Sequence, residues 1–264
     1  MLELKNVCKT FNPGTVNAKT ALNGLNLTLH DGDFVTVIGG NGAGKSTMLN
    51  AIAGSFQIDS GSIIIDGTDI TSLPEYKRAV FLGRVFQDPM MGTAPTMQIE
   101  ENLALAARRG QRRGLKWGIT KAERESYQEK LRSLDLGRED RMSAQVGLLS
   151  GGQRQALTLL MAALQKPKLL LLDEHTAALD PRTAAKVLAL SDRIVQEHNL
   201  TTLMITHNMK DAISHGNRLI MMDAGQVVVD ISGEEKKKLT VPDLLAMFSR
   251  ASGSDEANDK MLLS

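Results

Sequence analysis

The distribution of apolar and polar residues in the first part of the chain predicts strands followed by one helix. Polarity alternates over Leu2–Val7 and Leu22–Leu29, and the turn-rich stretch between them contains Asn-Pro-Gly. This pattern is typical of an antiparallel β layer. Phe34–Ile38 is a continuous apolar run that ends in glycines, and a helical pattern follows over Lys45–Ala53. A strand, a glycine-rich loop and a helix are therefore expected in that order.

The rest of the chain divides into a helical part and a part in which strands and helices alternate. Over residues 88–166, apolar residues recur at spacings of three and four, which predicts an inserted helical subdomain. Its expected helices are 99–108, 121–134 and 151–165. The expected buried strands that follow are 168–173, 201–206 and 218–223. Because such strands are apolar on both faces, we expect a mostly parallel sheet covered on both sides.

The bulk composition is that of an ordinary soluble domain. Apolar residues make up 42% of the 264 residues, and the net charge of +1 gives no overall attraction to nucleic acid or to an anionic membrane. The single cysteine, Cys8, cannot form an internal disulfide, which fits a reducing compartment. No signal peptide is expected, and no apolar run approaches the roughly 18 residues of a membrane-spanning helix. We therefore expect a cytoplasmic protein, whose membrane span, if needed, comes from another chain.

Residues 39–46 read GGNGAGKS and fit the phosphate-loop pattern G-x-x-x-x-G-K-[ST] between a predicted strand and a predicted helix. Glycines let backbone N–H groups turn toward phosphates, and the helix start attracts anions. Lys45 is expected to reach the β- and γ-phosphates, Ser46 to coordinate Mg²⁺, and Thr47 to bind a phosphate oxygen. The expected nucleotide-binding residues here are Gly39, Gly40, Asn41, Gly42, Ala43, Gly44, Lys45, Ser46 and Thr47.

An acid pair ends the predicted strand LLLLDE, at the edge of the sheet where open parallel sheets bind ligands. Asp173 suits the Mg²⁺ site or its water network, and Glu174 suits a residue that orients or deprotonates the attacking water. His207 follows another apolar strand and is expected to contact the γ-phosphate at the same edge. Taken alone, such acids are commonly helix caps or solvated turns, but together with a phosphate loop they favour hydrolysis.

Residues 149–153 read LSGGQ, and with this motif the chain resembles the ABC (ATP-binding cassette) ATPase family. The order of motifs agrees with the family: the phosphate loop, Gln87 in VFQDP, LSGGQ, the acid pair, Asp180 after Ala-Leu, and His207. The resemblance covers residues 1–248, which leaves 249–264 as a flexible tail. It implies an α/β fold: a P-loop NTPase core with a mostly parallel sheet, an N-terminal antiparallel β layer and the inserted helical subdomain.

The serine-glycine motif also predicts a partner. Ser150 caps a helix whose first amides, at Gly151 and Gly152, are able to bind an anion, but the helical subdomain holds them away from the phosphate loop of the same chain. The resemblance implies a head-to-tail dimer around two ATP molecules. In it the γ-phosphate lies between Lys45 of one copy and Ser150 of the other, and Gln153 belongs to the same motif.

The resemblance assigns further roles. Phe11 is similar to the aromatic residue that stacks on adenine, Gln87 to the glutamine that contacts Mg²⁺ and water and signals to the membrane subunit, and Asp180 to the aspartate that links the two sites. One departure is His175, where the family usually has proline. Loss of proline is expected to loosen the turn that carries Glu174, and His175 is either a pH sensor or a tolerated substitution.

Two surface features have open interpretations. A basic cluster either meets acidic loops of a membrane subunit or lipid headgroups, or is a solvated loop; it comprises Arg108, Arg109, Arg112, Arg113 and Lys116, with Trp117 beside it. Met90 and Met91 either contact the membrane partner or pack in the core.

The predicted function is that of the ATP-hydrolysing subunit of a bacterial ABC transporter at the cytoplasmic face of the membrane. The expected cofactors are ATP and Mg²⁺. The expected partners are a second copy of the chain, separate permease subunits and an extracytoplasmic solute-binding protein, with no nucleic acid; uptake of an amino acid or related solute is favoured. An ABC ATPase acting on DNA or ribosomes would need long heptad stretches or two cassettes, and a P-loop kinase would lack LSGGQ.

Overall fold

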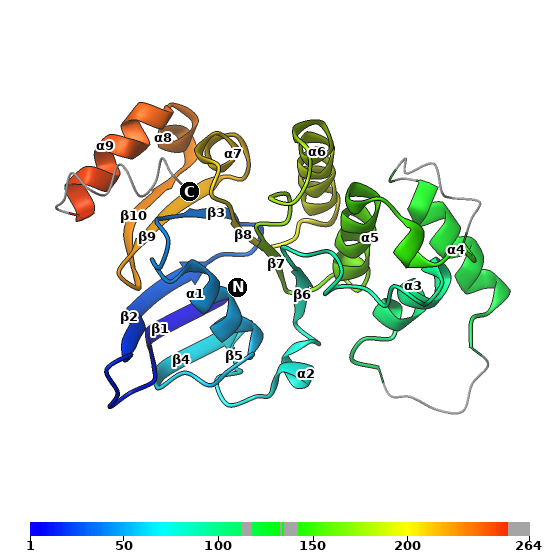
Figure 1. The fold of residues 1–264 in the computed structure, drawn as a ribbon, viewed down its shortest axis with the longest axis horizontal. Coiled ribbons are helices and arrows are strands. Elements are labelled where there is room, and N and C mark those ends of the chain that lie inside the picture. The colour runs from blue at the N-terminus through cyan, green and yellow to red at the C-terminus, as the bar shows by residue number, and fades with distance from the viewer. Residues whose placement is uncertain (112–117, 133, 135–141, 253–264) are drawn as a thin grey trace.

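The computed structural model describes residues 1–111, 118–132, 134 and 142–252, and it contains two β-sheets with helices around them (Figure 1). The first sheet is antiparallel, in the order β2-β1-β4-β5. Its strands are β1 (Leu2–Phe11), β2 (Lys19–Leu29), β4 (Ser60–Ile65) and β5 (Thr68–Asp69). This is the predicted N-terminal antiparallel layer.

The second sheet has the order β10-β9-β3-β8-β7-β6, and β10 is its antiparallel edge strand. The other neighbours pair in parallel, which confirms the mostly parallel sheet. The strands are β3 (Phe34–Ile38), β6 (Leu82–Val85), β7 (Leu169–Asp173), β8 (Thr202–Ile205), β9 (Arg218–Asp223) and β10 (Gln226–Ser232).

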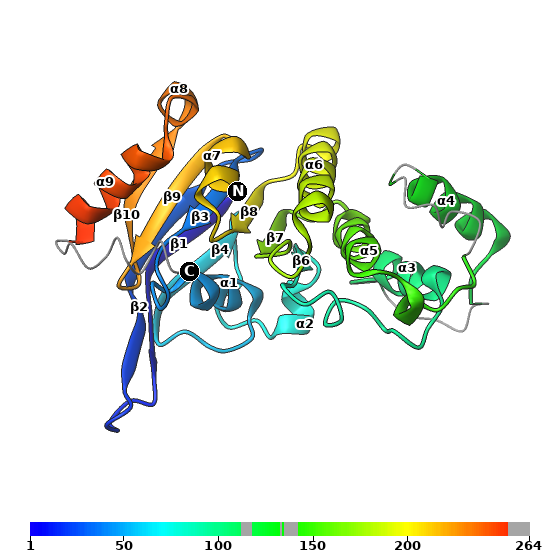
Figure 2. The same ribbon diagram turned by 45° about the horizontal axis from the view of Figure 1, so that its top comes forward.

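The helices form two groups. Between β6 and β7 the chain forms α3 (Ile99–Ala107), α4 (Lys121–Arg132), the short 3-10 helix η1 (Val146–Leu148) and α5 (Gly151–Ala163). Figures 1 and 2 place α3, α4 and α5 together at one end of the molecule, beyond β6 and β7. The others are α1 (Lys45–Ala53), α2 (Glu75–Arg78), α6 (Pro181–His198), α7 (Met209–Ser214), α8 (Gly233–Lys237) and α9 (Val241–Ser252).

The parallel sheet is buried on both faces, because alternate residues of each strand enter different cores. In β7, Leu169 and Leu171 pack in a core with the antiparallel sheet and α1. Leu170 and Leu172 pack in a second core with α5 and α6. This two-sided burial explains why the strand appears in the sequence as an uninterrupted apolar run. It also puts α1 and α5 on opposite faces of the sheet.

Two predicted boundaries were wrong. β1 and β2 extend into the segment predicted as a turn, where Thr10 pairs with Thr20 and Phe11 with Lys19; most of these residues are partly or fully exposed, so no apolar alternation marks the extension. The tail was predicted to begin at residue 249, but α9 continues to Ser252. Residues 253–264 lie outside the described residues. Among the described helices, none is long and apolar enough to cross a bilayer.

Candidate functional site

The phosphate loop packs so closely on its neighbours that two of its positions admit only glycine. Gly39 has φ 152°, and a Cβ there would lie 2.3 Å from the carbonyl oxygen of Met222. Gly44 has φ 101°, and a Cβ there would lie 2.6 Å from the carbonyl oxygen of Ala21. Both obstacles are backbone atoms that cannot rotate away. The loop is therefore packed closely between β9 and β2.

Lys45 lies inside this loop. Its ammonium donates to the carbonyl oxygens of Gly39 at 2.6 Å and Gly40 at 3.2 Å, and the side chain is buried. Burial lowers the pKa of Lys45, although the charges of Glu174 and Asp173 act in the opposite direction. At the start of α1 no side chain caps the backbone. The free amides and the adjacent ammonium make this helix start suited to a phosphate.

The two acids follow as predicted at the carboxyl end of β7. Asp173 is paired with Arg84 of β6, whose Nη2 lies 3.4 Å from the Asp173 Oδ2. Burial raises the pKa of Asp173, and the positive charge of Arg84 opposes that rise. Sequence analysis missed Arg84; its only signal is a charged residue inside the apolar strand β6.

Glu174 and His207 are brought together at this edge. Glu174 has φ 41°, in the left-handed region, and its backbone N–H donates to Ile205 at the end of β8. The Glu174 Oε2 lies 3.7 Å from the Nδ1 of His207, whose side chain is 41% exposed. A carboxylate beside a partly exposed imidazole, near Lys45, is a suitable arrangement for orienting and deprotonating a water molecule.

His175 corrects one expectation. The turn after Glu174 was expected to be loose without proline, but the His175 ring is buried and its Nε2 lies 2.9 Å from the hydroxyl of Ser191 on α6. That hydroxyl donates its own proton to the carbonyl oxygen of Val187, so the His175 Nε2 must be the donor. Burial, reinforced by the charge of His215, lowers the pKa of His175 to about 4. A neutral histidine thus ties the turn to α6.

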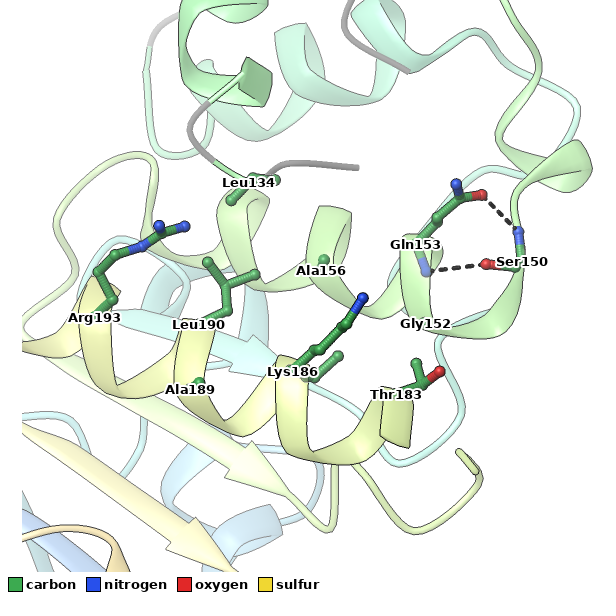
Figure 3. Close-up of a pocket in the computed structure, with 11 residues that line it drawn as sticks. Leu134, Ser150, Gly152, Gln153, Ala156, Thr183, Lys186, Ala189, Leu190 and Arg193 are labelled. Carbon is green, nitrogen blue, oxygen red and sulfur yellow. Dashed lines mark hydrogen bonds between the residues drawn. The ribbon is translucent and has the colours of Figure 1, made fainter. Parts of the chain in front are cut away.

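The serine-glycine motif forms the tip of α5 (Figure 3). The Ser150 hydroxyl accepts from the Gln153 N–H at 3.3 Å, and the Gln153 side chain accepts from the Ser150 N–H at 3.1 Å, which is a capping box. A Cβ on Gly152 would lie 2.1 Å from the Thr183 Cγ2 of α6, so glycine permits the close contact of the two helices. Ser150 itself is exposed.

The tip of α5 and the phosphate loop belong to different parts of the fold. In Figures 1 and 2, α1 lies beside the antiparallel sheet, whereas α5 lies across β7 from it with the helical subdomain. The structure therefore brings Lys45, Asp173, Glu174 and His207 to one edge and leaves Ser150 elsewhere.

The other predicted residues occupy varied surroundings. The ring of Phe11, at the end of β1, meets Phe56 edge to face at 5.3 Å, and the Lys9 ammonium lies 5.7 Å from its centre. Gln87 is exposed just after β6. Asp180 caps α6 by accepting from the Thr183 N–H at 3.1 Å, and this pairing lowers the pKa of Asp180.

The structure decides part of the interpretation of the basic cluster and of the two methionines. Arg108 pairs with Glu123 at 2.9 Å and Arg109 donates to the Ala162 carbonyl oxygen at 3.1 Å, so neither belongs to a freely solvated loop. The remaining members of the cluster lie outside the described residues: Arg112, Arg113, Lys116 and Trp117. Met90 and Met91 are 42% and 69% exposed, which excludes core packing.

Comparisons with known proteins identify the family. The ABC transporter family model matches residues 22–177. The tyrosine transport ATP-binding protein of Clostridioides difficile is 46% identical over 251 residues, which cover 95% of this chain and all of that protein. The methionine import ATP-binding protein of Rhizobium johnstonii is 38% identical over 211 residues, 79% of this chain and 56% of its own length.

Solved structures lead to the same family. A dimeric bacterial ABC transporter cassette has a TM-score of 0.75 and 31% identity, covering 88% of this chain and 98% of the solved chain. A dimeric cassette in a post-hydrolysis state with ADP and Pi has a TM-score of 0.74 at the same identity and coverage. The family match, the relatives and the phosphate-loop geometry agree, and this chain therefore belongs to the ABC transporter family as an ATP-hydrolysing, ATP-binding subunit.

Proposed function

We propose that this chain powers the uptake of an amino acid or a related small solute through separate membrane subunits, from the cytoplasmic face of the membrane. The ATP-driven part of the proposal rests on the meeting of Lys45, Glu174 and His207 at one sheet edge. The helix α5, which Ser150 caps, lies on the other side of β7 (Figure 1). The names of the relatives, which include transport or import of tyrosine, methionine and spermidine/putrescine, support uptake.

Mg²⁺ fits the residues at this edge. The Ser46 hydroxyl is exposed in the first turn of α1, and the Asp173 carboxylate is largely buried nearby, close enough to Lys45 to influence its pKa. Hydroxyl and carboxylate oxygens are the ligands that Mg²⁺ prefers. Ser46 and Gln87 would hold the ion directly and Asp173 through water, and the ion would neutralise charge on the β- and γ-phosphates.

The residues of the chain then divide the work of hydrolysis. The ammonium of Lys45 binds the γ-phosphate in place of the two carbonyl oxygens that it now contacts. The carboxylate of Glu174 takes a proton from the attacking water, and the imidazole of His207 orients the phosphate beside it. Phe11 stacks on the adenine ring.

The Ser150 tip completes the site of a second copy. The capping box at the start of α5 uses the N–H groups of Gln153 and Ser150, and a phosphate bound at this helix start would accept hydrogen bonds from the N–H groups of Gly151 and Gly152. Two copies packed head to tail bury two ATP molecules between them, with Asp180 linking the sites. The dimeric state of two similar solved cassettes supports this arrangement.

A groove between α2 and α3 suits the membrane subunit. It has a volume of about 590 Å³, and its apolar residues Tyr76, Val80 and Leu105 are 73%, 57% and 45% exposed. Arg108 and Arg109 form a basic wall of the same groove. A short amphipathic helix of a permease, with an apolar face and acidic ends, would cover these residues. Sequence analysis missed this groove because Leu105 is distant in the sequence from Tyr76 and Val80.

The test is uptake by the complete transporter. The chain, co-purified with the membrane subunits that bind it, is reconstituted in vesicles with ATP, and labelled tyrosine and methionine are supplied together with any solute-binding protein that associates with the complex. We expect ATP-dependent accumulation that Glu174→Gln abolishes. Equal accumulation with Glu174→Gln, or a chain that hydrolyses ATP but never associates with a membrane protein, would contradict the proposal.

A further inference from the structure

Lys19 lies over the phosphate loop, although it belongs to a different element. It is the first residue of β2 and pairs with Phe11 of β1. The Lys19 Nζ lies 3.3 Å from the position that a Cβ on Gly42 would occupy. The ammonium therefore contacts the middle of the loop, at a glycine with φ 84° whose backbone is exposed.

In the part of the chain that the structure describes, this ammonium has no partner of opposite charge. Within the described residues, the side chain of Lys19 makes no ion pair or hydrogen bond, and Lys19 is exposed. Lys9, on the neighbouring strand, is different because its ammonium pairs with Asp59 at 2.8 Å. Lys45 holds a second positive charge inside the same loop. Two ammonium groups on one loop repel each other unless an anion binds between them.

We propose that Lys19 is a ligand of the nucleotide phosphates, binding them from the side of the β1–β2 hairpin while Lys45 binds them from inside the loop. Since Phe11 is its cross-strand neighbour, Lys19 lies between the expected adenine site and the loop. Its contact is therefore with the α- and β-phosphates. This inference rests on the proposed nucleotide site and adds to it a ligand that lies outside the phosphate loop.

The test compares Lys19→Gln and Lys19→Arg with Lys5→Gln, which changes an exposed lysine on β1 that pairs with Glu3. Titration calorimetry measures the Kd of ADP, ATP and adenosine. Loss of a charge-assisted contact in Lys19→Gln should raise the Kd of ADP and of ATP by about tenfold and leave the Kd of adenosine unchanged. Lys19→Arg keeps the charge and should retain near-normal binding. The salt dependence of ADP binding should also fall in Lys19→Gln.

The possible outcomes distinguish a failure of the Lys19 proposal from a failure of the proposed nucleotide site. Equal ADP affinities for Lys19→Gln and Lys5→Gln would overturn the inference. So would an equal loss of affinity for adenosine, because that result means a contact to the base or ribose, or a local change in the hairpin. Lys45→Ala, which should abolish ADP binding, tests the nucleotide site independently of Lys19.

Discussion

The phosphate loop and the tip of α5 are both glycine-rich helix starts, but they are built in different ways. The loop is closed around its own lysine, and its glycines press on backbone carbonyls of β2 and β9. At the tip of α5, Ser150 is exposed, its hydroxyl caps the N–H of Gln153 alone, and Gly152 lies close to a side chain of α6. The difference supports the proposal that a single chain forms one half of the ATP site by itself. In that proposal the tip of α5 supplies the other half to a second copy.

The largest effect is expected from removing the base while leaving both helix starts intact. Glu174→Gln should lower the rate of ATP hydrolysis by about 10²–10⁴-fold, because the amide cannot accept the proton of the attacking water. Binding of ATP should change little, since Lys45 and the loop amides are untouched. Steady-state phosphate release and a nucleotide titration measure the two properties. Glu235→Gln, at an exposed position of α8, is the matched control; normal turnover by Glu174→Gln would refute the assignment.

The second prediction tests the different packing of the two helix starts with one glycine-to-alanine substitution in each. Gly39→Ala sets a methyl group against a backbone oxygen, and Gly152→Ala sets one against the Thr183 Cγ2. Each should lower the free energy of unfolding by about 1–3 kcal/mol. Thr183→Ser removes Cγ2, so it should restore the stability of Gly152→Ala, whereas no side-chain change can restore Gly39→Ala. Denaturant unfolding measures this, and failure of the rescue would mean that α5 and α6 do not touch as described.

The third prediction concerns the turn that joins the acid pair to α6. The pKa of His175 is about 4 in the folded chain and 6.5 is its ordinary value, so the unfolded state binds more protons between these pH values. The neutral ring of His175 therefore makes its whole contribution to the free energy of unfolding above pH 6.5, and this contribution is lost as the pH falls toward 4. Between pH 7 and pH 4.5, the free energy of unfolding should therefore fall by roughly 2 kcal/mol more in the parent chain than in His175→Gln, whose side chain cannot titrate. An equal loss in both proteins would show that His175 is not buried in its neutral form.

The sequence predicted the parts of the site that are formed by residues adjacent in the chain. It did not predict the contacts that depend on tertiary packing. The loop from Gly39 to Ser46 and the helix that follows were predictable because strand, glycines and lysine are adjacent in the chain. The pairing of Glu174 with His207 followed from the rule that parallel strands end at one edge. The buried contact of His175 with Ser191 was not predictable, because it joins residues on two elements through the tertiary fold.

Lys19 and Arg84 illustrate the same limit. Lys19 belongs to a strand extension whose residues are mostly exposed, so no apolar pattern placed it beside the loop. Arg84 appeared only as an unusual charge in an apolar strand, and its partner Asp173 became evident when β6 and β7 were seen to be neighbours. Both residues lie beside the site on elements that the motifs do not include.

The measurement that tests the central claim most directly is the mass of the Glu174→Gln chain with ATP and Mg²⁺, determined by sedimentation. The outward position of the α5 tip predicts a dimer of twice the 28.6 kDa chain mass when ATP is present and a monomer when it is absent. Adding Ser150→Glu, whose carboxylate repels phosphate, should keep the chain monomeric with ATP still bound. A Glu174→Gln chain that binds ATP and nevertheless stays monomeric would contradict the account.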